Sequence, residues 1–311
     1  MSDSVAAPTN PSGIDGASSV GIAKPLDHVR SPVEVQQPHV VEFQNVSKTF
    51  NVGKSNAFTA IRDITFVVED LKNKGEFVCI LGPSGCGKST ILRMIAGLEP
   101  HFPPTVGSVL VLGSPVVGPG SDRGMVFQDY TSFDNRSVLD NITFGLETQR
   151  IPRRKRQLLG QYWINEVGLN VAKDQNKYPH ELSGGMRQRV AIARSLILRP
   201  RIILMDEPFG ALDPQTRMNM QDLLISLWKS VNATVFFITH SIEEAVFLGD
   251  RVYVLSSSPG TMIREIEIEP ADRPAAEMQK EPRFQETVAF IRDLISSQEK
   301  PKSTGHSAPK G

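Results

Sequence analysis

FVCILGPSGCGKST, residues 77–90, is the stretch that decides the fold of this chain. Its first five residues are apolar and predict a buried strand, and the pattern G-x-x-x-x-G-K-[S/T] follows at once. The glycines let the backbone approach a ligand closely, so that successive N–H groups can surround phosphate oxygens. Because STILRMIAGL, residues 89–98, has a helical pattern, we expect a strand, a phosphate-binding loop and a helix in succession.

The residues of this loop have separate expected roles. Lys88 can reach the β- and γ-phosphates of a nucleotide, and the Ser89 hydroxyl can ligate Mg²⁺. We expect Cys86 to be a small packing residue rather than a nucleophile, because no activating partner is evident. The rest of the predicted phosphate site consists of Gly82, Pro83, Ser84, Gly85, Gly87 and Thr90.

The surroundings of the loop predict an α/β fold with a parallel sheet. RIILM (201–205) and TVFFIT (234–239) are apolar runs of strand length, and longer helical patterns separate such runs. Near the amino end, alternating segments are typical of antiparallel strands: VVEFQNVSKTF, IRDITFVVED and VGSVLVLG. From about residue 129 to 200 the pattern is mostly helical, which predicts a helical insertion.

Two of these strands end in polar side chains. Asp206 and Glu207 follow RIILM, and His240 follows TVFFIT, so all three should lie at the sheet edge that carries the phosphate loop. Asp206 would hold Mg²⁺, usually through water, and Glu207 would orient and deprotonate an attacking water. His240 could contact the γ-phosphate, although a single histidine at a strand end is more often structural.

Two further residues are candidates because of their place in the chain. The amide oxygen of Gln128, in GMVFQDY, could contact the metal or the water where the helical insertion begins. Phe50, in SKTF, could stack on adenine or could belong to the core.

LSGGMRQRVAIARSL, residues 182–196, predicts a second anion site. A serine and two glycines precede a helical pattern, and free N–H groups at a helix start attract negative charge. The same stretch also fits an N-capped amphipathic helix with Val190, Ala193 and Leu196 facing the core. The two interpretations are compatible.

The composition limits the classes of function. Lys plus Arg and Asp plus Glu are equal at 34 each among 311 residues, which gives no global attraction to nucleic acid or anionic lipid. With only Cys79 and Cys86, and a start that lacks a basic and an apolar segment, the sequence predicts a reducing cytoplasmic setting. No run reaches the roughly 20 apolar residues that span a bilayer. Residues 1–37 and 297–311 have the composition of disordered segments.

The order of the motifs resembles that of one family. GPSGCGKST is followed by FQ (127–128), LSGGMRQR (182–189), ILMDEP (203–208), ALD (211–213) and TH (239–240). This closely resembles the nucleotide-binding subunit of ABC transporters, over about residues 40 to 265. The resemblance implies a P-loop NTPase core with an amino-terminal antiparallel β subdomain and an inserted helical subdomain, all within residues 38–296.

The resemblance also implies how the site works. Two subunits would hold two ATP molecules head to tail, each between the phosphate loop of one chain and the LSGG segment of the other. Ser183, Gly184 and Gly185 would thus serve the γ-phosphate of the partner's ATP. The implied roles of the other residues are adenine stacking for Phe50, metal contact and coupling for Gln128, an inter-subunit loop acid at Asp213 and a γ-phosphate switch at His240.

The implied cofactors and partners follow. They are ATP and Mg²⁺, a second copy of the subunit, hydrophobic permease subunits and a solute-binding protein that acts through the permease, with no nucleic acid. The chain would lie peripherally on the cytoplasmic face of the inner membrane. We expect residues 129–141, just after Gln128, to contribute to a groove for a short cytoplasmic helix of the permease.

The segments EPFGALDPQTR (207–217) and THSIEEAVFLGDRVYVLSSSPG (239–260) are most similar to importers of the taurine, sulfonate, nitrate and bicarbonate group. YTSFDNRSV (130–138) lacks the Pro-Trp common in that group. Two alternatives stay open: an exporter subunit, and a soluble ABC-type ATPase that contacts nucleic acid or ribosomes through RRKR (153–156).

Overall fold

The computed structural model describes residues 39–71, 74–129 and 132–299. The predicted amino-terminal extension 1–37 lies outside the described residues. So does the predicted carboxy-terminal tail, except for residues 297–299, which belong to the last helix.

A six-stranded sheet forms the centre of the fold, in the order β10-β9-β3-β8-β7-β6. Its strands from β9 to β6 are parallel, and β10 pairs antiparallel with β9. Every residue of β3, β7 and β8 is buried, as expected for parallel strands covered on both faces. The bounds are β3 Phe77–Leu81, β6 Arg123–Val126, β7 Ile202–Asp206, β8 Thr234–Ile238, β9 Arg251–Leu255 and β10 Met262–Glu267.

A smaller antiparallel sheet is formed near the amino end, in the order β2-β1-β4-β5. It consists of β1 Val41–Phe50, β2 Phe58–Val68, β4 Val106–Val111 and β5 Ser114–Pro115. Its inner face shares one hydrophobic cluster with α1 (Lys88–Ala96) and with one face of the central sheet, and Phe43 stacks on Phe66 there at 4.6 Å between ring centroids. The predicted antiparallel subdomain is thereby confirmed.

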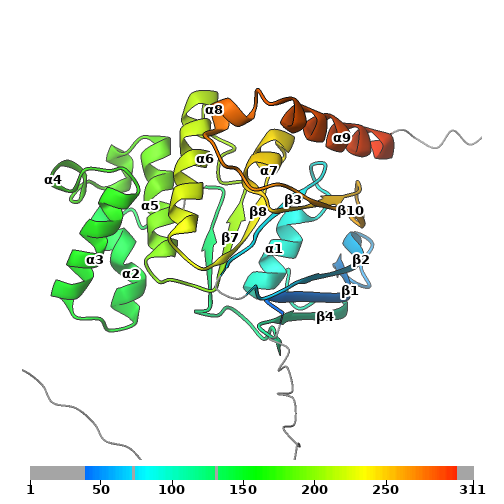
Figure 1. Cartoon of the computed structure of the whole chain (residues 1–311). Helices are drawn as coiled ribbons and strands as arrows, with labels where there is room; N and C mark the ends of the chain where they lie inside the picture. Colours follow the sequence, from blue (N-terminus) through cyan, green and yellow to red (C-terminus); the bar gives the residue numbers. More distant parts are fainter. Residues whose placement is uncertain (1–38, 72–73, 130–131, 300–311) are drawn as a thin grey trace, which may run out of the picture. The chain divides into compact units, whose positions relative to one another are not determined.

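Helices occupy the chain between β6 and β7, and Figure 1 shows them on the side of the molecule away from β1, β2 and β4. They are α2 Val138–Thr148, α3 Arg153–Glu166, α4 Val171–Asp174, a 3₁₀ turn at Pro179–Glu181 and α5 Gly184–Leu196. Val190, Ala193 and Leu196 of α5 are buried in a cluster that includes residues of the central sheet. The helical insertion is therefore packed against the core through α5.

The remaining helices are α6 Pro214–Lys229, α7 Ile242–Leu248, α8 Ala275–Met278 and α9 Pro282–Glu299. α9 packs near α7, and its side chains Phe284, Val288 and Ile291 are buried in the main cluster. An ion pair of 3.1 Å joins Arg292 of α9 to Glu243 of α7. No helix in the described part of the chain is long and apolar enough to cross a membrane.

Candidate active site

Neighbouring parallel strands place the predicted polar residues at one edge of the central sheet. Ile80 of β3 pairs with Ile238 of β8, and Ile238 pairs with Asp206 of β7. The chain therefore leaves β3, β7 and β8 at the same edge, where it continues into the phosphate loop, the acidic pair and His240. β6 ends beside β7, two residues before Gln128, which is exposed.

The phosphate loop depends on its glycines. A Cβ on Gly82 would lie 2.7 Å from Cys86 Sγ, and one on Gly87, whose φ is +95°, would lie 2.4 Å from Ile61 Cγ2. Gly87 caps α1 and has no side chain of its own that could occupy the N–H groups at the start of that helix. Those donors and the helix dipole fit a phosphate group.

Lys88 begins α1 and folds back over the loop. Its Nζ donates to the carbonyl oxygens of Gly82 at 2.8 Å and Pro83 at 3.0 Å, and the residue is 5 % exposed. Cys86 is fully buried, and burial raises the pKa of its thiol, an effect that the nearby Lys88 opposes. The cysteine thus packs inside the loop, while the lysine places a positive charge at the phosphate site.

An oxygen pair next to the loop fits a magnesium ion. Ser89 Oγ donates to Asp206 Oδ1 at 2.8 Å, and Asp206 is 1 % exposed. Hydroxyl and carboxylate oxygens are the hard ligands that Mg²⁺ prefers. The other oxygen of Asp206 forms an ion pair of 3.3 Å with Arg93, a residue that the sequence analysis did not identify. Arg93 lies four residues after Ser89, on the same face of α1, and this spacing could have identified it from the sequence.

The candidate general base lies beside the candidate γ-phosphate ligand. Glu207 Oε2 is 3.5 Å from His240 Nδ1, and both side chains reach solvent. Glu207 has a positive φ of 46°, and its N–H donates to the carbonyl of Ile238 at 3.1 Å. A non-glycine residue with positive φ is uncommon and is often found at functional sites, where surrounding contacts hold it.

Phe50 lies at the end of β1, in a polar and aromatic group rather than in the core. Its ring centroid is 5.4 Å from that of His101 and 5.3 Å from Lys48 Nζ. Lys48 Nζ in turn donates to the carbonyl oxygen of Pro103 at 2.7 Å. The sequence analysis missed His101 and Lys48, because neither belongs to a motif.

The second predicted cradle lies at the start of α5. Ser183 caps the helix by accepting the N–H of Met186 at 3.3 Å, and its own side chain is exposed. Asp213 caps the neighbouring α6 by accepting the N–H of Thr216 at 3.0 Å, and hydrogen bonds from Thr216 lower the pKa of its carboxyl group. A Cβ on Gly185 would lie 3.3 Å from Thr216 Cγ2, so the two helix starts are adjacent.

Within the described residues of this one chain, no hydrogen bond or ion pair joins Ser183, Gly184 or Gly185 to the loop Gly82–Thr90. The two predicted anion sites are therefore not joined by such contacts within one chain.

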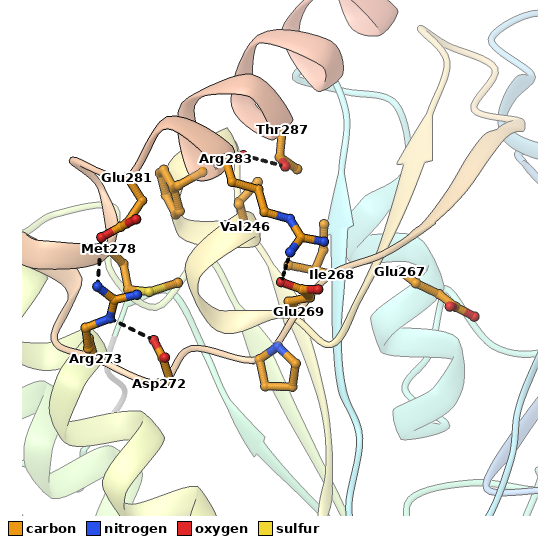
Figure 2. A pocket seen from close by; sticks show the side chains of 12 residues that line it. Val246, Glu267, Ile268, Glu269, Asp272, Arg273, Met278, Glu281, Arg283 and Thr287 are labelled. Carbon is orange, nitrogen blue, oxygen red and sulfur yellow. Dashed lines mark hydrogen bonds and ion pairs between the residues drawn. The ribbon is translucent and has the colours of Figure 1, made fainter.

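A cavity of about 530 Å³ lies elsewhere, between α7, α8, α9 and the segment after β10. Figure 2 shows its arginines turned toward carboxylates: Arg273 pairs with Asp272 and Glu281, and Arg283 pairs with Glu269. None of the strand ends described above lines this cavity. These exposed ion pairs join the start of α9, and the residue before it, to the segment that follows β10.

Comparison with known proteins shows which family the chain is similar to. The nitrate import ATP-binding protein NrtD of Synechocystis sp. is 45 % identical over 265 residues, which are 83 % of this chain and 96 % of NrtD. This chain belongs to the ABC transporter family. The family model, described as ABC transporter, matches residues 68–210. The taurine import ATP-binding protein TauB of Pelagibacter ubique is 40 % identical over 82 % of this ABC chain and 95 % of TauB.

Solved structures show the same ABC fold. The dimeric ATP-binding cassette MJ0796 bound to ADP and Pi matches with a TM-score of 0.63 and 31 % identity, over 74 % of this chain and 99 % of that one. CbiO1 of Clostridium perfringens matches in fold with a TM-score of 0.65 at 23 % identity, over 85 % of this chain and all of that one. The predictions of an ABC transporter ATPase and of its fold are confirmed.

Proposed function

We propose that this ATPase holds its nucleotide at the edge formed by β3, β7 and β8. Lys88 and N–H groups at the start of α1 would bind the phosphates, and Phe50 would stack on the adenine. Ser89 and Asp206 would hold Mg²⁺, with Gln128 as a further oxygen ligand. The ion, when bound, neutralises charge that develops on the phosphates. The 2.8 Å contact between Ser89 and Asp206 is the observation that best supports the assignment.

The proposed chemistry places the proton of the attacking water on Glu207. A carboxylate can accept this proton, and general-base catalysis typically contributes roughly 10²–10⁴-fold. His240, 3.5 Å from that carboxylate, would contact the γ-phosphate. Both side chains reach solvent at the sheet edge that carries the loop, so a nucleotide bound there could contact them.

The second cradle would serve the ATP of a partner copy. Among the described residues, no hydrogen bond or ion pair joins Ser183, Gly184 or Gly185 to the phosphate loop of the same chain, which supports this, as does the dimeric cassette among the similar structures. Asp213, exposed at the adjacent helix start, would lie in the same interface.

A mixed dimer tests the shared site. One chain carries Lys88→Ala and the other Ser183→Arg, both with Glu207→Gln to prevent hydrolysis. If sites are shared head to tail, both lesions fall in one site, so the mixed dimer should occlude one ATP while each parent homodimer occludes none. No occluded ATP in any of the three folded and assembled dimers would refute the arrangement.

The transporter would be an importer of a small anion or organic solute such as nitrate, taurine or a sulfonate. The nearly full-length similarity to nitrate and taurine import proteins supports this. The chain would act on the cytoplasmic face of the membrane with permease subunits and a solute-binding protein. Uptake of labelled nitrate, taurine and bicarbonate, compared between the wild type and a Glu207→Gln strain, tests the assignment; unchanged uptake of all three would count against it.

The permease would contact an aromatic and cationic group before and within α2. Phe133 and Phe144 have ring centroids 4.5 Å apart, and the Arg136 guanidinium lies 4.8 Å from that of Phe144. Phe133 is 39 % exposed, so an apolar partner can reach it. Asn141 fixes the loop by accepting the Phe133 N–H at 2.8 Å and donating to the Arg136 carbonyl at 2.9 Å. Phe133→Ala and Arg136→Ala should therefore uncouple transport while ATP binding persists; full transport by both would contradict this role.

A further inference from the structure

A buried carboxylate joins the loop of His240 to the helix that follows Asp213. Glu244 lies in the first turn of α7 and is 5 % exposed. Its Oε2 accepts a hydrogen bond from Thr239 Oγ1 at 2.5 Å, and its Oε1 lies 3.5 Å from Arg217 Nε of α6. Helix α6, which follows β7, and the His240 loop, which follows β8, thus both contact the Glu244 side chain.

The hydrogen bonds around Glu244 include the residues on both sides of His240. Thr239 Oγ1 accepts the N–H of Ser241 at 3.0 Å, and Ser241 Oγ accepts the N–H of Glu244 at 3.1 Å. Thr239 and Ser241 flank His240 directly. The backbone that carries the histidine is therefore held by a closed set of hydrogen bonds that includes Glu244.

On the other side, the network reaches the loop before α6. Arg217 Nη2 donates to the carbonyl oxygen of Leu212 at 3.2 Å, and Leu212 immediately precedes Asp213. A buried carboxylate is costly unless it is paired and hydrogen-bonded, so its partners are held in one arrangement. Glu244 thereby links the Asp213 loop and the His240 loop in a single arrangement.

We infer that Glu244 is a positioning residue that sets the place of His240 relative to α6. It acts on hydrolysis through the histidine, without touching the nucleotide. This inference rests on the proposed role of His240. It predicts that loss of the negative charge at Glu244 impairs the hydrolytic step more than nucleotide binding, because the phosphate loop does not belong to the network.

Glu244→Gln in the full-length chain is the first variant. It preserves shape and an acceptor for Thr239 but removes the charge opposite Arg217. Single-turnover ATP hydrolysis should fall by roughly 10- to 100-fold, since small misplacements of reacting groups have effects of this size. The Kd for ATP should stay within about threefold of the wild-type value. Arg217→Met should produce a similar loss, and the double variant should lose little more than either single one, because contacting residues are not additive.

Glu243→Gln is the matched control. Glu243 is the neighbour of Glu244 on the same helix, is 45 % exposed and also pairs with an arginine, Arg292 at 3.1 Å. Its Oε2 accepts a hydrogen bond from Ser241 Oγ at 3.1 Å, and the amide oxygen of glutamine can still accept that bond. Its substitution should leave the hydrolysis rate unchanged, which separates the proposed role from a general effect of removing a carboxylate from α7.

The decisive comparison adds Glu244→Gln to His240→Ala. A residue that acts through the histidine should cause no further loss in that background. The same fold-loss in both backgrounds would overturn the inference, as would a loss of hydrolysis matched by a loss of ATP binding and of folded protein. Wild-type hydrolysis by His240→Ala alone would instead overturn the role proposed for His240, so the two failures are distinguishable.

Discussion

Gly87→Ala tests how the phosphate loop is held against β2. The new Cβ would lie 2.4 Å from Ile61 Cγ2 and 2.9 Å from the carbonyl oxygen of Ala60. Ile61 is fully buried, and Ala60 O accepts the N–H of Gly260 at 2.9 Å, so neither neighbour can withdraw freely. The positive φ costs about 1–2 kcal/mol for alanine, and overpacking typically costs about 1–3 kcal/mol more. We expect the free energy of unfolding to fall by about 2–5 kcal/mol.

Gly53→Ala is the control for this variant. Gly53 has a similar φ of +78°, but a Cβ there meets nothing within 4 Å. It should cost only the conformational part, about 1–2 kcal/mol. Urea unfolding of the full chain without nucleotide measures both changes, provided that the slopes agree. Equal destabilisation by the two substitutions would refute the argument from close approach. ATP affinity should fall for the Gly87 variant alone, because its loop must shift.

Other predictions concern chemistry and packing. Glu207→Gln should retain ATP binding but lose roughly 10²–10⁴-fold in hydrolysis rate, because an amide nitrogen cannot accept the proton; a near-normal rate in steady-state assays would identify another base. Burial raises the pKa of both Cys79 and Cys86, so a thiol reagent should label the native chain far more slowly than the unfolded chain, and rapid native labelling would contradict this. Ile291→Ala should destabilise the chain by about 2–5 kcal/mol in thermal unfolding, and a loss below about 1 kcal/mol would mean that α9 is poorly packed.

The sequence predicted those parts of the site that are formed by residues close together in the chain, such as the end of a strand or the start of a helix. The phosphate loop follows a buried strand and begins a helix, and Asp206 ends another buried strand, so their side chains had to meet at one sheet edge. Ser183 was identified for the same reason, since a helix cap depends on residues three positions apart. Asp213 was named only through the family resemblance, and its cap on α6 was not predicted.

The parts that sequence did not predict depend on contacts between distant segments. Arg93 and Asp206 are 113 positions apart, and Arg217 and Glu244 lie on different helices, so neither ion pair can be assigned from local spacing alone. The positive φ of Glu207 is similarly invisible, because an acidic residue at that position would ordinarily suggest an extended or helical backbone. The packing of α9 on α7 also results from tertiary contact rather than from a motif.

These long-range contacts bear on why one chain carries two anion sites. Asp213 caps α6, Arg217 one turn later pairs with Glu244, and Glu244 binds the threonine beside His240. We proposed that Asp213 faces a second copy of the chain. If that partner displaced the Asp213 loop, the ion pair between Arg217 and Glu244 and the hydrogen bond between Glu244 and Thr239 would move His240 with it. Hydrolysis at one phosphate loop would then depend on the other chain in two separate ways. The LSGG segment of the partner would complete the phosphate contacts. Contact of the partner with the Asp213 loop would determine the position of His240.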